Sequence, residues 1–289
     1  MSAQPAPQIP SDNRSRIIGP FDRMAQWPWW LLLAVMIAAY IIFLIITDEQ
    51  MQKTFWFISG QTPTALWGGQ ILFKGMAVTL TVSITAYSMA LLIGMTLGLM
   101  RSSTNPFFYN FSSFYVEIVR GIPMLVLLLY VAFALTPIFV NLLNSIGIPI
   151  QTRDVPGYVR AIIALAIGYG AFSAEIFRAG IQSIERGQYE AARALGMNYF
   201  QIMSRVILPQ AIRRVLPALG NDFIAMVKDS SLVAILGVQD MTQLTRLYYS
   251  GNFLYMQSLT MLAFMYLIMV VMLTRFVRWM EHRLQRGSR

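Results

Sequence analysis

The sequence predicts an all-α membrane protein with about six transmembrane helices. Hydrophobic residues make up 56% of the chain and charged residues only 12%, and the mean hydropathy is +0.56. Soluble domains carry roughly twice this share of charge. Apolar runs of ~20 residues recur along the chain, which is the length that crosses a hydrocarbon core of ~30 Å. Because backbone groups in lipid must bond internally, these runs are expected to be helices. The short alternating segments of a β-barrel are absent from the sequence.

The apolar runs place the spans in order. They are predicted at 28–47, 76–100, 121–142, 159–177, 216–238 and 257–277. No small-residue cleavage site stands before Asp48, so the first run is expected to be an uncleaved helix and not a signal peptide.

The same pattern predicts the domain organisation. Residues 1–27 form a cytoplasmic tail, and 28–47 form an additional N-terminal transmembrane helix. Residues 48–75 form an external loop with an interfacial helix, because tryptophan favours headgroup depth. A five-helix core follows at 76–280, with a basic cytoplasmic tail at 281–289.

The distribution of basic residues predicts the orientation. Six spans put both termini on one side. If that side is inside, every arginine except Arg153, Arg160 and Arg246 lies in an inner segment, and only Lys53 and Lys74 join those three outside. This asymmetry favours cytoplasmic termini. The arginines lie beside membrane spans, so the net charge of +9 indicates contact with anionic lipid and not with nucleic acid.

Several classes of chemistry are excluded by residues that the chain lacks. It has no cysteine and one histidine, His282, in the basic tail, so neither a metal site nor histidine-based catalysis is expected. None of its lysines follows a glycine, so it has no phosphate-binding loop. If the chain takes part in an ATP-driven process, the ATPase must be another chain, and no cofactor is expected on this one.

A polar segment from Glu190 to Pro209 separates the fourth and fifth predicted spans. Its alanines favour a helix, and Gly196 suits a left-handed helix C-terminus. Asn198 and Gln201 are spaced like a capping box that opens a second helix. Pro209, which cannot donate a backbone hydrogen bond, is expected to mark a break.

The surface of this helix-turn-helix has two predicted features. Glu190 can pair on one helical face with Arg186 or Arg193. Phe200, Met203 and Ile207 form an apolar stripe at helical spacing. Two interpretations remain open at this point: a surface loop that packs on its own bundle, and a docking site for a cytosolic partner.

The segment resembles the EAA loop of ABC importer permeases through Glu190-Ala191-Ala192, Gly196 and Val206-x-Leu208-Pro209. Other motifs are similar to the polar amino acid branch of that family. These are Tyr115-x-Glu117-x-x-Arg120-Gly121-Ile122-Pro123, Ala174-Glu175-x-x-Arg178-Ala179-Gly180, Gly187-Gln188, Leu216-Pro217 with Asn221, and Lys228-Asp229-Ser230-Ser231-Leu232. The resemblance runs from about residue 74 to the last residue given.

The resemblance implies a fold like that of type I ABC importers, in the plasma (inner) membrane of a bacterium. It implies uptake of polar amino acids of the histidine, glutamate, glutamine or arginine type. The implied partners are cytosolic ATPase subunits, a second permease and an extracytoplasmic binding protein. The loop at about 185–210 would be the coupling loop. Its implied ATPase-coupling residues are Glu190, Ala191, Ala192, Gly196, Val206, Leu208 and Pro209.

The sequence departs from the family pattern in three places. Val206 stands where isoleucine is usual, and Ser230 stands where threonine is common. The helix before Asp48 is additional to the five-helix core of this branch.

Charged and polar residues within the spans are candidates for the translocation path, because charges at membrane depth usually face a partner or a watery cavity. The candidates are Asn221, Lys228, Ser230, Ser231, Glu117, Arg120 and Glu175. Each has a structural alternative: Lys228 could pair with Glu175 or Glu117 and hold helices together. Likewise, Glu117 and Arg120 could form an ion pair within one helix.

Gly94 and Gly98 are spaced for close helix approach, either within the protomer or between two permeases. The competing functional class is a self-contained secondary transporter or channel for small polar solutes, which would show inverted repeats or broken helices. A membrane scaffold without a transport role is the third class.

Overall fold

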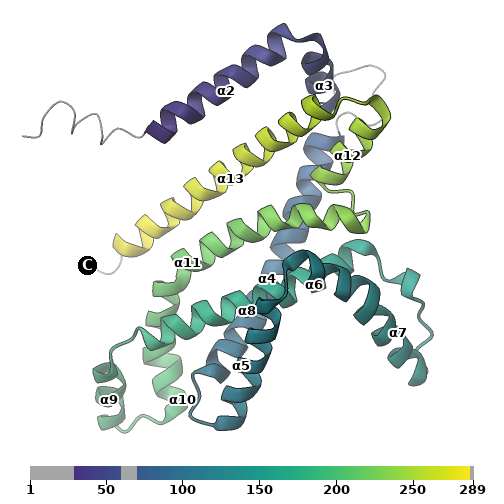
Figure 1. Ribbon diagram of the computed structural model, residues 1–289. Helices are drawn as coiled ribbons and strands as arrows, with labels where there is room; N and C mark the ends of the chain where they lie inside the picture. The colour runs from purple at the N-terminus through teal and green to yellow at the C-terminus, as the bar shows by residue number, and fades with distance from the viewer. Residues whose placement is uncertain (1–28, 60–69, 287–289) are drawn as a thin grey trace, which may run out of the picture. The chain divides into compact units, whose positions relative to one another are not determined.

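The computed structural model describes residues 29–59 and 70–286, and every regular element within these ranges is a helix or a helical turn (Figure 1). The elements are α2 (Trp29–Thr47), α3 (Glu49–Ser59), η1 (Gln70–Gly75), α4 (Met76–Arg101), α5 (Pro106–Gly121), α6 (Met124–Tyr130), η2 (Val131–Leu135), α7 (Thr136–Ser145), η3 (Thr152–Asp154), α8 (Gly157–Gln182), α9 (Arg186–Ala194), α10 (Tyr199–Ile202), η4 (Met203–Ile207), α11 (Leu208–Asp229), η5 (Ser230–Leu236), α12 (Met241–Asn252) and α13 (Tyr255–Arg286). The prediction of an all-α fold is confirmed for this part of the chain.

The chain forms two compact units, residues 1–49 and 50–289. In the first, α2 is the described helix, and it coincides with the first predicted span. Large apolar side chains are exposed along it, including Met36 and Ile46. This all-round apolar surface suits lipid. The predicted N-terminal tail (1–27) lies outside the described residues.

Four helical segments are long and apolar enough to cross a membrane in the ranges that the structure describes. They are Phe73–Arg101, Met124–Ser145, Gly157–Gln182 and Tyr255–Arg283. A fifth is counted if Val35–Thr47 and Glu49–Ser59 are one broken span. The predicted fifth span (216–238) corresponds to α11 and η5, where arginines, aspartates and Lys228 lower the hydropathy. The total of six spans stays a prediction.

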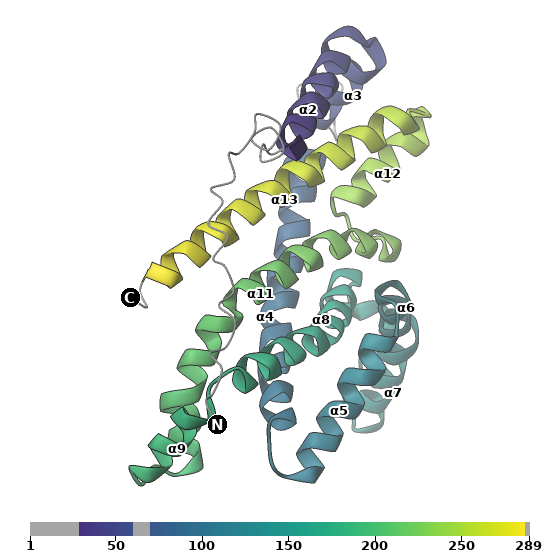
Figure 2. The same cartoon turned by 60° about the vertical axis from the view of Figure 1, so that its left-hand side comes forward.

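The core of the second unit is the interface between α4 and α8, which cross in the middle of Figures 1 and 2. Small residues let the two backbones approach closely. A Cβ added at Gly94 would lie 2.5 Å from Ser173 Cβ, and one at Gly98 would lie 2.8 Å from Phe177 Cβ. Gly94 and Gly98 therefore allow close packing of α4 against α8 within the protomer, which is one of the two alternatives that the sequence left open. Ala90 and Leu165 are fully buried in the same core.

Two π turns lie just before prolines in long helices, a feature that the sequence did not indicate. η2 is followed at once by Thr136-Pro137, and η4 by Leu208-Pro209. Proline lacks an N–H donor, and its ring crowds the preceding turn of a helix. The wider π turn accommodates both effects, so helical backbone continues from Tyr199 to Asp229. The predicted break at Pro209 is therefore wrong: the proline occupies the first turn of α11, where its missing N–H is tolerated.

Within the second unit, α9 and α10 lie at the same end as the turn between α4 and α5, and α12 lies at the other end (Figures 1 and 2). Side-chain contacts join α3 to α12 and α13 at this end. The rings of Phe57 and Tyr248 stack with centroids 4.0 Å apart, and Gln257 Nε2 donates to Gln50 Oε1 at 2.7 Å. Asp240 caps α12 by accepting from the Gln243 N–H at 2.9 Å.

Candidate functional site: the loop between α8 and α11 and the polar residues of the bundle

The loop between α8 and α11 is a compact helix-turn-helix, as predicted. Gly196 has a φ of +79°, the left-handed conformation that favours glycine. The turn closes as the Gly196 N–H donates to Arg193 O at 3.0 Å and the Met197 N–H to Ala192 O at 3.2 Å. Because a Cβ is strained at this φ, Gly196 fixes the angle between α9 and α10.

The predicted capping box opens α10. Asn198 Oδ1 accepts from the Gln201 N–H at 2.9 Å, and Gln201 Oε1 accepts from the Asn198 N–H at 2.9 Å. Two backbone donors at the start of the helix are thereby satisfied.

The loop has a small hydrophobic core of its own. It consists of Ile184, Ala192, Ile202, Ile207 and Ala211. Of the predicted coupling residues, Ala192 is buried in this core, and Val206 and Leu208 are half-buried. Glu190, Ala191, Gly196 and Pro209 are exposed. Some residues of the motif thus stabilise the loop, and others remain available to a partner.

Large apolar side chains point away from that core. Leu195 is 82% exposed and Phe200 is 78% exposed. The predicted apolar stripe is therefore divided, since Ile207 is buried and Met203 half-buried while Phe200 is open. Sequence reasoning missed Leu195, whose signal was a large apolar residue directly before the turn glycine. Partial burial, together with Tyr189, raises the pKa of the neighbouring Tyr199 phenol.

A groove of about 300 Å³ lies between the loop and the turn that joins α4 to α5. Its lining comprises Leu99, Met100, Ser103, Phe108, Tyr199, Phe200, Met203, Ser204 and Leu208. Phe108 and Phe200 both face this groove while remaining exposed. The apolar surface of the loop therefore continues onto the membrane bundle.

The ion pairs proposed for Glu190 do not form among the described residues, where neither Arg186 nor Arg193 contacts it. The three side chains are exposed. Exposed pairs of this kind are worth little, so solvation replaces them at small cost.

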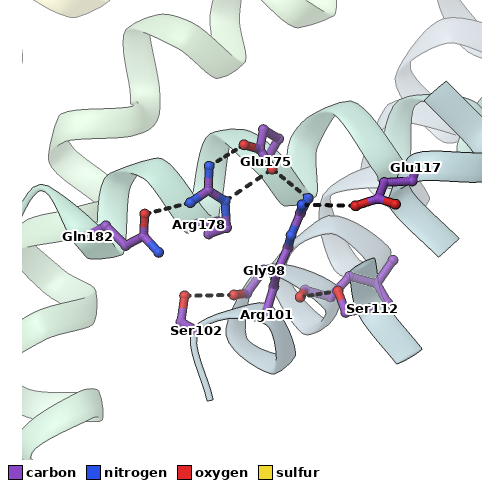
Figure 3. A network of polar contacts seen from close by, with 9 residues as sticks. Gly98, Arg101, Ser102, Ser112, Glu117, Glu175, Arg178 and Gln182 are labelled. Atoms are coloured by element: carbon purple, nitrogen blue, oxygen red, sulfur yellow. Dashed lines mark hydrogen bonds and ion pairs between the residues drawn. The ribbon is translucent and has the colours of Figure 1, made fainter. Parts of the chain in front are cut away.

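Near the end of α8, Glu175 and Arg178 form a network of ion pairs and hydrogen bonds with residues of α4 and α5 (Figure 3). Glu175 accepts from Arg101 Nη1 at 2.7 Å and from Arg178 Nε at 3.1 Å. Arg178 Nη1 also donates to Gln182 at 2.6 Å. Glu117 lies 3.9 Å from Arg101 at the edge of the network. The network joins α4, α5 and α8.

Two of the structural alternatives for these charges are wrong. Glu117 faces Arg101 and does not pair with Arg120; the Arg120 guanidinium lies 5.4 Å from the centre of the Phe172 ring, within the range of a cation–π contact. Lys228 does not pair with Glu175 or Glu117, because both carboxylates face Arg101. Side-chain direction, which sequence spacing does not fix, decided both cases.

The polar residues of α11 separate into two groups. Asp222 faces α4 and α8, accepting from Ser173 Oγ at 3.1 Å, and Tyr87 Oη donates to Leu219 O at 2.6 Å. Asp229 accepts from Tyr169 Oη at 2.8 Å. Sequence reasoning missed Tyr87, Tyr169 and Ser173, since tyrosine and serine are common in helices of either environment.

Lys228, at the end of α11, and Ser231, in η5, instead line a cavity of about 470 Å³ with Thr242 and Tyr266. Lys228 is exposed and has no ion pair in the described ranges. The other path candidates lie elsewhere. Ser230 is buried and donates to Val227 O at 2.7 Å, and Asn221 is exposed. Glu117 and Glu175 face Arg101, and Arg120 lies beside Phe172.

The sequence of the chain is similar to those of known proteins. The family model for binding-protein-dependent transport system inner membrane components matches residues 90–286. The chain is 34% identical over 200 residues to the probable amino-acid permease protein YxeN of Bacillus subtilis, covering 69% of this chain and 85% of that protein. It is 31% identical over 223 residues to the glutamine transport system permease protein GlnP of Escherichia coli, covering 77% and 97%.

The fold is similar as well. A solved amino acid ABC transporter with histidines matches with a TM-score of 0.62 and 35% sequence identity, covering 74% of this chain and 94% of that one.

Proposed function

Because the chain belongs to the family of binding-protein-dependent transport system inner membrane components, we propose that it is the permease subunit of an ATP-driven importer of polar amino acids. The curated relatives that it matches are amino-acid and glutamine permeases. The chain carries the solute path, and a separate chain hydrolyses ATP.

One observation supports the coupling role most directly: Leu195 and Phe200 are exposed on a loop that has its own core. Apolar side chains exposed to water at this level mark a partner surface. The partner is the ATPase, and the coupling surface comprises Glu190, Ala191, Gly196, Leu195 and Phe200.

The mechanism is alternating access. Closure of two ATPase subunits on ATP moves the coupling loops of two permeases. Because α10, η4 and α11 form continuous helical backbone, displacement of the loop moves α11, which carries the polar residues at membrane depth. The path then opens to the outside and receives an amino acid from a binding protein.

The solute path passes α11. Lys228 and Ser231 line a cavity there, and an unpaired ammonium group can hold the carboxylate of a zwitterion. The arginine distribution supports cytoplasmic termini, which puts the coupling loop in the cytosol of a bacterial cell.

The test is a membrane pull-down through a tag on the C-terminal tail. Recovery of an ATPase, lost with Glu190→Lys or Gly196→Asp, is the expected result, with amino-acid uptake lost in parallel. Glu281→Lys makes the same charge change on α13 and is the matched control, so its recovery should equal that of the wild type. Normal copurification and uptake with both loop variants would refute the coupling role. Uptake by the isolated chain without ATP would favour a secondary transporter instead.

A further inference from the structure

A cavity of about 580 Å³ lies beside the beginning of α4, remote from the coupling loop. We call it the outer cavity. Lys74 of η1 and one face of α4, with Val78 and Thr81, form one wall. The start of α8 and residues 236–239 form the other wall, which includes Tyr158 and Gln239. Its volume falls within the range of about 300–1,000 Å³ typical of ligand pockets.

Close backbone contacts hold the walls of the outer cavity in place. A Cβ added at Gly75 would lie 2.9 Å from Met241 Cα, and one at Gly157 would lie 2.9 Å from Leu236 O. Thr79 Oγ1 also accepts from the Met241 N–H at 3.3 Å. The cavity is therefore formed by the fold itself and needs no ligand to create it.

The lining of the outer cavity combines an apolar wall with a few polar groups. Most of the wall is apolar, but Lys74, Thr81, Tyr158 and Gln239 bring polar groups to it. None of these four side chains has a hydrogen bond or an ion pair within residues 29–59 and 70–286. The lining contains no aspartate or glutamate, so Lys74 gives it a net positive charge.

The polar groups extend along the helical backbone from Lys74 to Thr81. Thr81 follows Lys74 by two helical turns, which is about 10 Å along the axis. The cavity thus has an exposed cation at one end and an exposed hydroxyl farther along α4, a separation comparable to the length of an extended polar amino acid.

We propose that the outer cavity is a subsite for the imported amino acid, in which Lys74 binds the α-carboxylate and Thr81 and Gln239 meet its polar side chain. This inference rests on the proposed function and adds a site on the face of α4, separate from the cavity beside Lys228. Solute released from the binding protein is held here before it passes α11.

The experiment uses the permease with its ATPase in phosphatidylcholine nanodiscs, without binding protein. Saturation-transfer NMR is recorded with each of the twenty amino acids, because it detects weak ligands. Lys74→Gln should weaken binding of the amino acids that give a signal by about tenfold, the effect of losing one charged hydrogen bond. Lys74→Arg should restore binding. Arg246→Gln, which removes an exposed charge from α12, should leave it unchanged.

A second probe identifies the group that Lys74 holds. The α-amide of the same amino acid should bind about tenfold more weakly than the acid to the wild type, and Lys74→Gln should weaken the amide no further. Thr81→Leu, which removes a hydroxyl from the α4 side of the cavity, should weaken both ligands.

The subsite would be overturned by no signal from the wild type, by equal affinity in Lys74→Gln, or by equal losses for acid and amide. Competition by phosphatidylglycerol in the discs would assign Lys74 to a lipid phosphate and overturn it too. ATP-driven uptake with the binding protein is measured in parallel. If uptake is normal but the binding results contradict the subsite, the proposed import function still stands. If the wild-type protein imports no amino acid, both the import function and the subsite are refuted.

Discussion

The α4–α8 interface and the coupling loop are both helical, yet they are stabilised in different ways. Between α4 and α8, glycine and alanine allow the backbones to touch, and the contact extends over most of both helices. The coupling loop has a core of five buried side chains and carries some of the most exposed apolar residues of the chain. In lipid an exposed apolar side chain is at no disadvantage, but in water it is. An exposed apolar side chain therefore indicates a partner surface in the loop, whereas in the bundle it does not distinguish a partner from lipid.

Gly94→Leu should have the largest effect, because its side chain has no space against Ser173. Overpacking of this kind costs roughly 3 kcal/mol or more, so we expect loss of the folded bundle. Thermal unfolding in detergent measures it. Gly251→Leu, where a Cβ would meet nothing within 4 Å, is the control. A bundle that tolerates Gly94→Leu would show that α4 and α8 do not pack as described.

Ile202→Ala should disrupt the loop and leave the bundle folded. Ile202 is 1% exposed in the core of the loop, and a deletion of this size costs about 3 kcal/mol. Hydrogen exchange should become faster in α9 and α10 but not in α4 or α8. Ile212→Ala, at a position 39% exposed, should change little. Equal acceleration in α8 would mean that the loop does not fold as a separate cluster.

Glu175→Gln should give an intermediate loss of about 2 kcal/mol, because Arg101 and Arg178 then lose their shared carboxylate. Glu117→Gln is the matched control: its side chain is 74% exposed and 3.9 Å from Arg101, so its effect should stay below about 0.5 kcal/mol. Unfolding of both variants in detergent, combined with Arg101→Gln in a double-mutant cycle, measures the coupling. Equal effects of the two substitutions would contradict the network.

Phe200→Ser should have the smallest effect on stability and a large one on assembly. Its side chain is 78% exposed, so unfolding should shift by less than about 0.5 kcal/mol. Loss of an apolar anchor from a partner surface costs about 2 kcal/mol of binding, near thirtyfold in affinity for the ATPase. Phe253→Ser, at a residue 79% exposed near α12, should leave affinity unchanged. The coupling surface would have to be redrawn if the ATPase bound Phe200→Ser normally.

Sequence reasoning predicted the helical fold, the loop and its caps well, because these depend on local chemistry. Gly196, Asn198 and Gln201 act on their own backbone, and hydropathy along the chain is enough to locate α2, α4, α8 and α13. The break at Pro209 was wrong because a π turn can absorb a proline, which depends on the geometry of the preceding turn.

The site was predicted less completely. The pairing of Arg101 with Glu175, and the positions of Tyr87 and Ser173 around Asp222, join residues far apart in sequence. No spacing rule within one helix reaches such contacts. For the same reason the sequence could not show which of the path candidates lie together, as Lys228 and Ser231 do in one cavity.

The core within the coupling loop also bears on how such proteins diverge. Ile184 and Ala211 bracket a segment that keeps its shape through its own contacts. Mutations on its outer face can therefore accumulate without disturbing the membrane bundle, and a permease can follow sequence drift in its ATPase. Exchanging residues 184–211 between two related permeases should exchange their ATPase preference while each keeps its solute.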